Sequence, residues 1–398
     1  MKGIVVTRTI EPCEGGRSRG LGAGLFFLTM TGIMSCSGDG GGTNPSGTGA
    51  ANQFAYVVNS GNDTIQAYTV DGNGTFTAAG GQGFQPTGIF PHDVDVDKKG
   101  RFVYISNRGS NFVSGYKINP DGSLSPINGA TNGSPVTNPQ NTDPTDNNPL
   151  SIAFDQSGQF LYVIAGLPPG FSTLKIYTVD SSTGTLTQIG TTGPITQCLN
   201  GHRVRITPNN SFLYVACQDS GVINAFSRDT GTGQLTDLGQ TIVGGTTSDV
   251  AIDPGTHFLF SSSTNSVAVY TINSNGTLSP IVGGQNIFAA DNTPHAVTLD
   301  PSGQFLYTAN INAATISAYQ VDQNTGALTP LVGSPFTTGG EPNYVLVHPD
   351  GKVLFTADAL ASEIARFTVN ADGTLSRAVN AVTFPAGNGT SGIAMTKF

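Results

Sequence analysis

Three aromatic or glycine positions recur in seven copies from Phe54 onward, and this repeat limits the possible folds more than any other feature. Each copy opens with an apolar residue, a spacer and an aromatic residue, the aromatics being Tyr56, Tyr104, Tyr162, Tyr214, Phe260, Tyr307 and Phe355. A second aromatic follows at Tyr68, Tyr116, Tyr177, Phe226, Tyr270, Tyr319 and Phe367. A Gly-x-Leu or Gly-x-Phe step closes each copy, at Gly74, Gly122, Gly184, Gly233, Gly276, Gly326 and Gly373. Successive copies are about 48 residues apart, a period at which each repeat forms one small sheet.

A run of alternating apolar and polar residues precedes six of the copies and ends in a turn sequence such as Asp300 to Gly303. Period-2 alternation predicts a strand, and the Asp-Pro-Ser-Gly type of ending predicts a tight turn. The first copy lacks this run, and a matching run, Ser391 to Phe398, stands at the C-terminus. We therefore predict an all-β fold over residues 54–398, a seven-bladed β-propeller with four-stranded blades, in which the C-terminal strand joins the N-terminal blade. A linear solenoid is the alternative, but we recognise none of the capping repeats that it needs.

Residues 1–35 resemble a bacterial export signal. Two arginines precede an apolar run at 21–34, which is shorter than the roughly 20 apolar residues of a membrane span. The run ends in Ile-Met-Ser followed by Cys36, which resembles a lipobox. We predict a lipoprotein signal peptide at 1–35, lipidation of Cys36 and a flexible Gly/Ser/Thr tether at 36–53. The protein would then be an exported lipoprotein of the outer membrane, periplasm or cell surface; the alternative is an ordinary cleaved signal peptide.

The charge of the chain argues against nucleic-acid partners. The formal net charge is −9, and no cluster of lysine and arginine occurs beyond the N-terminal segment. Phosphate backbones need concentrated positive charge. We expect a monomer that contacts the membrane only through its lipid anchor.

Two of the four cysteines remain for the folded part, because Cys13 lies in the predicted signal peptide and Cys36 is assigned to lipid. In an oxidising compartment Cys198 and Cys217 could pair. In a hairpin turning near Asn209, however, position 217 would lie opposite about 202 rather than 198. We therefore expect two thiols.

The repeat resembles that of the lactonase family of seven-bladed propellers, the 6-phosphogluconolactonase-like proteins. The stretch from Asp300 to Leu331 (DPSGQFLYTANINAATISAYQVDQNTGALTPL) carries the resemblance most fully, and similar copies cover 54–398. The resemblance implies the propeller fold and, less specifically, hydrolysis of a cyclic ester.

One histidine fits the position of a histidine in the family's motif. The related enzymes have a histidine in a context like Gly-Cys-His-x-x-x-x-Ser-Pro, and 201–208 reads Gly-His-Arg-Val-Arg-Ile-Thr-Pro. The resemblance therefore makes His202 a candidate general acid or base. The following blade of the family carries an arginine and later a glutamate, where this chain has Thr-Ser-Asp at 247–249 and Ser-Thr at 263–264. These replacements count against a phosphorylated substrate.

Candidate site residues are polar groups at the starts of inner strands or just after second strands, because these places share one face of a propeller. The catalytic candidates are His202 and Arg108, and the ligand-binding candidates are His92, His295, Arg203, Asp249, Asn310 and Asn343. Lactone hydrolysis needs a base to activate water and a cation to stabilise the developing oxyanion. As sequence neighbours on a strand, His202 and Arg203 should point to opposite faces, whereas Arg108 lies beyond a strand end. Alternatively, His92 and His295 cap their strands, and Asn310 serves turn chemistry.

Two functions stay open at this point. One is hydrolysis of a sugar lactone with a substituted anion site. The other is a non-catalytic surface or periplasmic propeller that binds an envelope protein or glycan. We predict no cofactor and no metal, because no pair of ligands has zinc spacing. Calcium could bind the loop at 130–149 through Asp143 and Asp146, but we favour a polar loop without a metal.

Overall fold

The computed structural model describes residues 53–127, 148–166, 170–281, 286–377, 382–383 and 389–396. The predicted signal peptide, Cys36, both aspartates of the 130–149 loop and nearly all of the tether lie outside these residues. Within the described ranges, no helix has the length and apolar character needed to cross a membrane.

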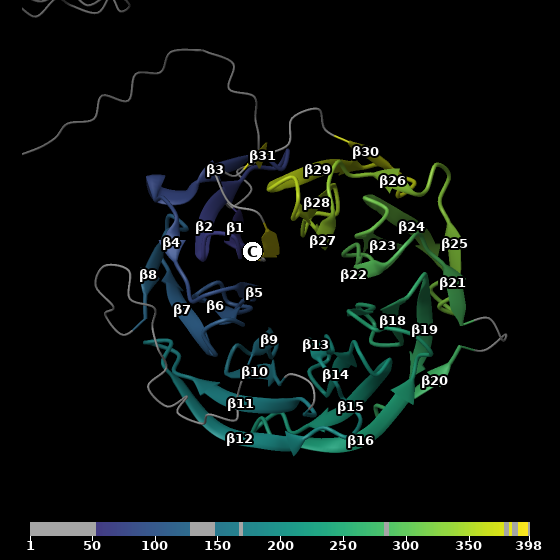
Figure 1. Cartoon of the computed structure of the whole chain (residues 1–398), viewed down its shortest axis with the longest axis horizontal. Coiled ribbons are helices and arrows are strands. Elements are labelled where there is room, and N and C mark those ends of the chain that lie inside the picture. The colour runs from purple at the N-terminus through teal and green to yellow at the C-terminus, as the bar shows by residue number, and fades with distance from the viewer. Residues whose placement is uncertain are drawn as a thin grey trace, which may run out of the picture. The chain divides into compact units, whose positions relative to one another are not determined.

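The described strands form seven antiparallel sheets arranged in a ring, which confirms the seven-bladed propeller (Figure 1). The inner strands are β32 (Thr390–Met395), β5 (Pro91–Val96), β9 (Pro149–Phe154), β13 (Gly201–Ile206), β17 (Val250–Ile252), β22 (Pro294–Leu299) and β27 (Pro342–Val347), of blades 1 to 7 respectively. The second strands are β1 (Gln53–Asn59), β6 (Phe102–Asn107), β10 (Phe160–Ala165), β14 (Phe212–Cys217), β18 (Phe258–Ser263), β23 (Phe305–Asn310) and β28 (Val353–Asp358).

The third strands are β2 (Thr64–Val70), β7 (Phe112–Ile118), β11 (Thr173–Val179), β15 (Val222–Arg228), β19 (Ser266–Ile272), β24 (Thr315–Val321) and β29 (Glu363–Val369). The outer strands are β3 (Phe76–Ala78), β8 (Leu124–Pro126), β12 (Leu186–Pro194), β16 (Leu235–Ile242), β20 (Leu278–Pro280), β25 (Leu328–Pro330) and β30 (Leu375–Arg377). Short strands β4 (Gln85–Pro86), β21 (Ile287–Ala289), β26 (Phe336–Thr337) and β31 (Val382–Thr383) and a 3₁₀ turn, η1 (Ala79–Gly81), complete the described elements.

The C-terminal strand closes the ring as predicted. β32 pairs antiparallel with β1, with Val57 opposite Ile393. The pairing continues past the strand, where the amide of Thr396 donates to the carbonyl of Phe54 at 2.9 Å. Blade 1 is thus built from both ends of the propeller, and its inner strand is paired like those of the other blades.

The repeated tyrosine and glycine positions join neighbouring blades. The hydroxyl of Tyr162 in blade 3 donates to the carbonyl of Gly233 in blade 4 at 2.7 Å. Gly233 has a φ of +74°, and a Cβ there would meet the Phe160 ring at 2.4 Å. Only glycine fits both the turn and this close approach. The columns read from the sequence are therefore contacts between blades.

A bulge near the start of the inner strand recurs in six blades. The register skips one residue in each, namely Leu150, His92, His202, His295, Asn343 and Ser391. A bulge re-aims a side chain, because the extra residue breaks the alternation of faces. This corrects the expectation that His202 and Arg203 point to opposite faces. Both contact residues of non-adjacent blades across the ring, so both point toward its axis.

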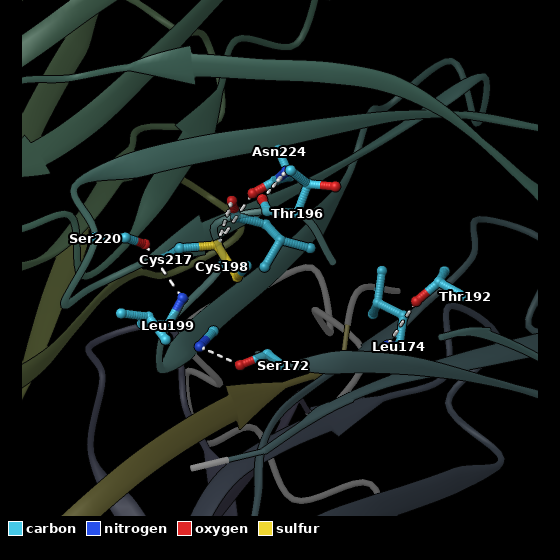
Figure 2. The surroundings of a disulfide bond; sticks show 11 residues. Ser172, Leu174, Thr192, Thr196, Cys198, Leu199, Cys217, Ser220 and Asn224 are labelled. Carbon is cyan, nitrogen blue, oxygen red and sulfur yellow. Dashed lines mark hydrogen bonds between the residues drawn. A yellow bond between two sulfur atoms is a disulfide. The ribbon is translucent and has the colours of Figure 1, made fainter. Parts of the chain in front are cut away.

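The expectation of two thiols was wrong, because Cys198 and Cys217 form a disulfide with their Cα atoms 5.1 Å apart (Figure 2). Cys217 lies opposite Gly201 in the ladder, close to the predicted register. Cys198, however, belongs to the loop before β13, where its amide donates to the carbonyl of Ile195 at 3.1 Å. This turn brings Cys198 back over the end of β14. Strand register could not predict a contact made from a loop.

Candidate functional site

Three histidines from alternate blades meet in the central channel at the starts of their inner strands. His92, His202 and His295 belong to β5, β13 and β22. The ring centroid of His202 is 5.2 Å from that of His92 and 4.9 Å from that of His295, with the rings edge to face in both pairs. His202 is buried, with 5% of its surface exposed, and the other two are half-buried. The bulges place all three in one cluster, which we call the histidine cluster.

The hydrogen bonds of these rings fix which nitrogen carries the proton. Nδ1 of His202 lies 2.8 Å from the carbonyl of Ser248, in the next blade. Nδ1 of His92 and Nδ1 of His295 make the same bond to the carbonyls of Leu150 and Asn343, at 2.8 and 3.0 Å. A carbonyl oxygen only accepts, so each Nδ1 holds a proton and each neutral ring has a lone pair on Nε2.

The surroundings keep these histidines neutral. Burial lowers the pKa of His202 well below its ordinary value, and the neighbouring His295, His92 and Arg203 lower it further. Burial, followed by the charge of Arg203, lowers the pKa of His92 to about 4. Burial also lowers the pKa of His295. At neutral pH the cluster is therefore a group of proton acceptors.

A layer of buried charges lies directly beneath the histidine cluster. Nη1 of Arg203 is 2.7 Å from Oδ1 of Asp93 in blade 2, and its Nε is 3.6 Å from Oδ1 of Asp249 in blade 5. Asp93 also accepts from the hydroxyl of Ser151 at 2.6 Å. Burial raises the pKa of Asp93, but the charges of Arg203 and Arg205 outweigh it, so the pKa is lowered overall. We call Asp93, Arg203 and Asp249 the ionic belt.

The other predicted site residues are placed differently. Arg108 is exposed on the same face, where its amide donates to the carbonyl of Phe90 at 2.9 Å; its guanidinium makes no hydrogen bond or ion pair with any described residue. Asn343 contributes its backbone carbonyl to His295. Asn310 does not join the site, since its amide nitrogen bonds Thr315 and Ser317 within its own blade at 3.1 and 2.9 Å.

The positions where the family carries an arginine and a glutamate hold small hydroxyl residues. The hydroxyl of Ser248 accepts from the amide of Gln218 at 2.9 Å. The hydroxyl of Thr264 accepts from the backbone amide of Thr246 at 3.2 Å. Neither hydroxyl can neutralise a phosphate.

Sequence reasoning missed two channel residues, Arg205 and Tyr344. Nη2 of Arg205 lies 3.2 Å from Oδ1 of Asp249, and the Tyr344 ring lies 5.2 Å from the guanidinium carbon of Arg203. The sequence holds a signal for both. Arg205 lies two residues after Arg203, so its side chain is on the same face of the strand. Tyr344 occupies the position in the last repeat that Arg203 occupies in the fourth. Among the described residues, no three histidine, cysteine or acidic side chains are grouped to hold a metal ion.

Comparison with known proteins gives one family and several similar chains. The model of the family described as "Lactonase, 7-bladed beta-propeller" matches residues 48–138, 134–252 and 244–336. A 6-phosphogluconolactonase of Yersinia pestis is 25% identical over 287 residues, covering 69% of this chain and 79% of that protein.

Two solved structures have the same fold at low identity. One from Bacteroides fragilis superposes with a TM-score of 0.70 at 18% identity, covering 89% of this chain and 100% of that one. The periplasmic gluconolactonase of Pseudomonas aeruginosa gives a TM-score of 0.68 at 17% identity, covering 87% and 99%. At such identities these two likenesses show the fold alone.

Proposed function

Since the chain belongs to the lactonase family of seven-bladed β-propellers, we propose that it hydrolyses an unphosphorylated sugar lactone at the histidine cluster. The observation that carries the proposal is the neutral ring of His202, with its Nδ1 fixed by the Ser248 carbonyl and its Nε2 lone pair left free to take a proton. The relatives named 6-phosphogluconolactonase support the reaction class.

The proposed reaction is general-base hydrolysis. Nε2 of His202 takes a proton from a water molecule while the water oxygen attacks the lactone carbonyl carbon. Arg108 directly follows β6, and its guanidinium has no other partner among the described residues. In this proposal the guanidinium stabilises the oxyanion of the tetrahedral intermediate. Collapse of the intermediate breaks the ring C–O bond, and the imidazolium returns the proton to the leaving alkoxide. The product is a hydroxy acid.

The substrate is uncharged in this proposal. A phosphorylated lactone would need cations to pair with its phosphate. Beside His202 the family's arginine is replaced by Ser248 and its neighbours, and Arg203 is already paired with Asp93. Hydroxyl groups at Ser248 and Thr264 instead suit a neutral sugar ring.

We further propose that the protein works outside the cytoplasm as a monomer held to a membrane by lipid on Cys36. The support is the sequence of residues 21–36 alone, where an apolar run leads to a lipobox-like tetrapeptide. An unphosphorylated substrate agrees with this location.

The proposal is tested by lactone hydrolysis with the full chain, measured against the spontaneous rate. The assay compares an unphosphorylated gluconolactone with 6-phosphogluconolactone. We expect turnover of the first, a loss of about 100-fold or more in His202→Ala, and no loss in His257→Ala. His257 is the matched control, because 69% of its side chain is exposed in the turn between β17 and β18, at the other end of the inner strands. Turnover that survives His202→Ala would refute the assigned base.

A second candidate, a non-catalytic module that binds an envelope protein or glycan, is favoured by one observation. Ile89 and Phe90 are 52% and 60% exposed next to Arg108, so the face with the histidines carries apolar side chains in solvent. Absence of turnover on every lactone by the folded protein would favour this candidate.

A further inference from the structure

A cavity lies at the end of the inner strands opposite the histidine cluster. Its volume is about 490 Å³, and it is lined by the later halves of the inner strands and by the turns that follow them. The histidines stand at the beginnings of those same strands, and no residue of the ionic belt or of the histidine cluster lines the cavity. The belt therefore separates two sites. A volume between about 300 and 1,000 Å³ is usual for a small-molecule site.

We propose that this cavity binds a neutral, hydroxyl-rich small molecule such as a monosaccharide or disaccharide. The proposal concerns a site distinct from the histidine cluster and does not depend on the hydrolytic function.

The first support is an unpartnered hydroxyl at the inner end of the cavity. Tyr344 lines the cavity and is only 9% exposed, yet its hydroxyl makes no hydrogen bond with any described residue. Its ring is held against the guanidinium of Arg203, at 5.2 Å. The hydroxyl oxygen is open to the cavity rather than enclosed by protein, so it is available both to donate to and to accept from a polar ligand.

The second support is that donors and acceptors face the cavity together. Arg205 and Asp95 both line it, with 27% and 23% of their side chains exposed. Arg205 offers only donors, Asp95 only acceptors, and the Tyr344 hydroxyl offers both. Sugar hydroxyls donate and accept at once, so they match this mixed set.

Charge argues against an anionic ligand. Nη2 of Arg205 is already paired with Asp249 at 3.2 Å, and the negative charges of Asp93 and Asp95 also act on it. At the mouth, Lys98 is offset by Asp95, 3.4 Å away. A carboxylate that entered the cavity would therefore lose its hydration and meet little net positive charge in return. A neutral ligand carries no charge that must be compensated.

The walls suit a sugar ring. Four blades place a proline at matching turn positions around the mouth, namely Pro208, Pro254, Pro301 and Pro349. Proline rings are rigid, so this rim costs little conformational entropy when a ligand packs on it. The C–H face of a pyranose is apolar and can pack on such a surface.

Titration calorimetry with the full chain tests the proposal, using glucose and maltose as neutral probes and glucuronate as the anionic probe. We expect both neutral sugars to bind and glucuronate to bind several-fold more weakly. Tyr344→Phe should weaken maltose binding about fivefold to tenfold, the effect of one lost hydrogen bond. His202→Ala should leave maltose binding unchanged, since it alters the other end of the channel.

A second variant guards against loss of the fold. Asp95→Asn keeps the shape of the side chain and removes one charge-assisted acceptor, so it too should weaken maltose binding. Three results would overturn the proposal: no binding of either neutral sugar, equal maltose affinity in wild type and both cavity variants, or tighter binding of glucuronate than of glucose. Maltose binding lost in His202→Ala and kept in Tyr344→Phe would move the site to the histidine cluster.

Discussion

Nη1 of Arg203 lies 2.7 Å from Oδ1 of Asp93, although the two residues stand on inner strands of blades that are not neighbours. Both side chains are almost fully buried, with 1% and 2% exposed. Together with Asp249 they cross the channel and divide it into the histidine cluster on one side and the cavity on the other. The belt also supplies a positive charge beneath His202, which helps to keep that ring neutral.

Removing one partner of this pair should destabilise the protein strongly. In Asp93→Ala the guanidinium of Arg203 would stay buried without its nearest carboxylate, and breaking a buried pair costs about 3–5 kcal/mol. Lys98→Ala, which breaks the more exposed 3.4 Å pair with Asp95, is the matched control and should cost less than about 1 kcal/mol. Urea unfolding of both variants measures the difference. If the two variants lost the same free energy of unfolding, the buried pair would stabilise the protein no more than the exposed pair does.

The activity should persist into mildly acidic solution. A general base works while it is unprotonated, and burial with the neighbouring histidines lowers the pKa of His202. Lowering the pKa moves protonation to lower pH, so the acid limb of kcat/KM should lie well below the ordinary histidine value of about 6.5. A pH–rate profile of lactone hydrolysis checks this. An acid limb at or above 6.5 would contradict His202 as the base in this environment.

The fold followed from the sequence because its signals are repeated and local. Tyr162 and Gly233 belong to columns that recur in every blade, so seven copies of one weak pattern made a strong one. Ring closure was equally visible. The copy that begins at Phe54 lacks the alternating segment that precedes the other six, and one such segment, at 391–398, has no copy after it.

The candidate site was only partly predictable, because its geometry depends on departures from the regular strand. His92, His202 and His295 were found as polar residues at strand starts, but the bulge that turns them to the axis leaves no mark on a period-2 pattern. The pairing of Arg203 with Asp93 joins blades 2 and 4, and nothing in the spacing of the repeats specifies it. The disulfide between Cys198 and Cys217 was likewise not predictable, because Cys198 lies in a loop and strand register does not specify its position.

The lipid anchor gives a prediction independent of the propeller. Acylation of Cys36 would bind the chain to a membrane, so Cys36→Ser should move the protein from the membrane fraction to the soluble fraction. Cys13→Ser is the control, because Cys13 lies in the segment that processing would remove. Fractionation followed by immunoblotting measures both. Unchanged membrane association of Cys36→Ser would rule out the lipoprotein.

The disulfide should contribute measurably to stability. Cys198 and Cys217 are 19 residues apart in sequence, and closing a loop of that order restricts the unfolded chain by about 3 kcal/mol. The double variant Cys198→Ala/Cys217→Ala should lose about that much, and a reducing agent should destabilise the wild type but not the variant. Urea unfolding with and without reductant is the measurement. Peptide mapping without reduction provides the control, and free thiols at both positions would refute the bond.

Asp358 should make stability fall between about pH 4 and pH 6. Its side chain is fully buried and neither carboxylate oxygen has a hydrogen-bond partner among the described residues. At the matching position in blade 2, the amide of Asn107 donates to Ser114 at 2.9 Å, whereas the residue seven positions after Asp358 is Ala365, which has no hydroxyl. Burial raises the pKa of Asp358 from its ordinary value of 3.8 to about 6.

The sign of this effect follows from which state ionises first. Below about pH 4 the carboxyl is protonated in both states and costs nothing; between pH 4 and 6 the unfolded chain ionises first, which favours unfolding by up to about 3 kcal/mol. Above pH 6 both states are ionised and the loss is complete. Asp358→Asn should therefore match the wild type near pH 4 and be more stable at pH 7. Asp237→Asn, on an exposed stretch of β16, should show no such difference. Unfolding free energies of all three proteins at both pH values test this, and an Asp358→Asn variant that is no more stable at pH 7 would show that the buried carboxyl is compensated.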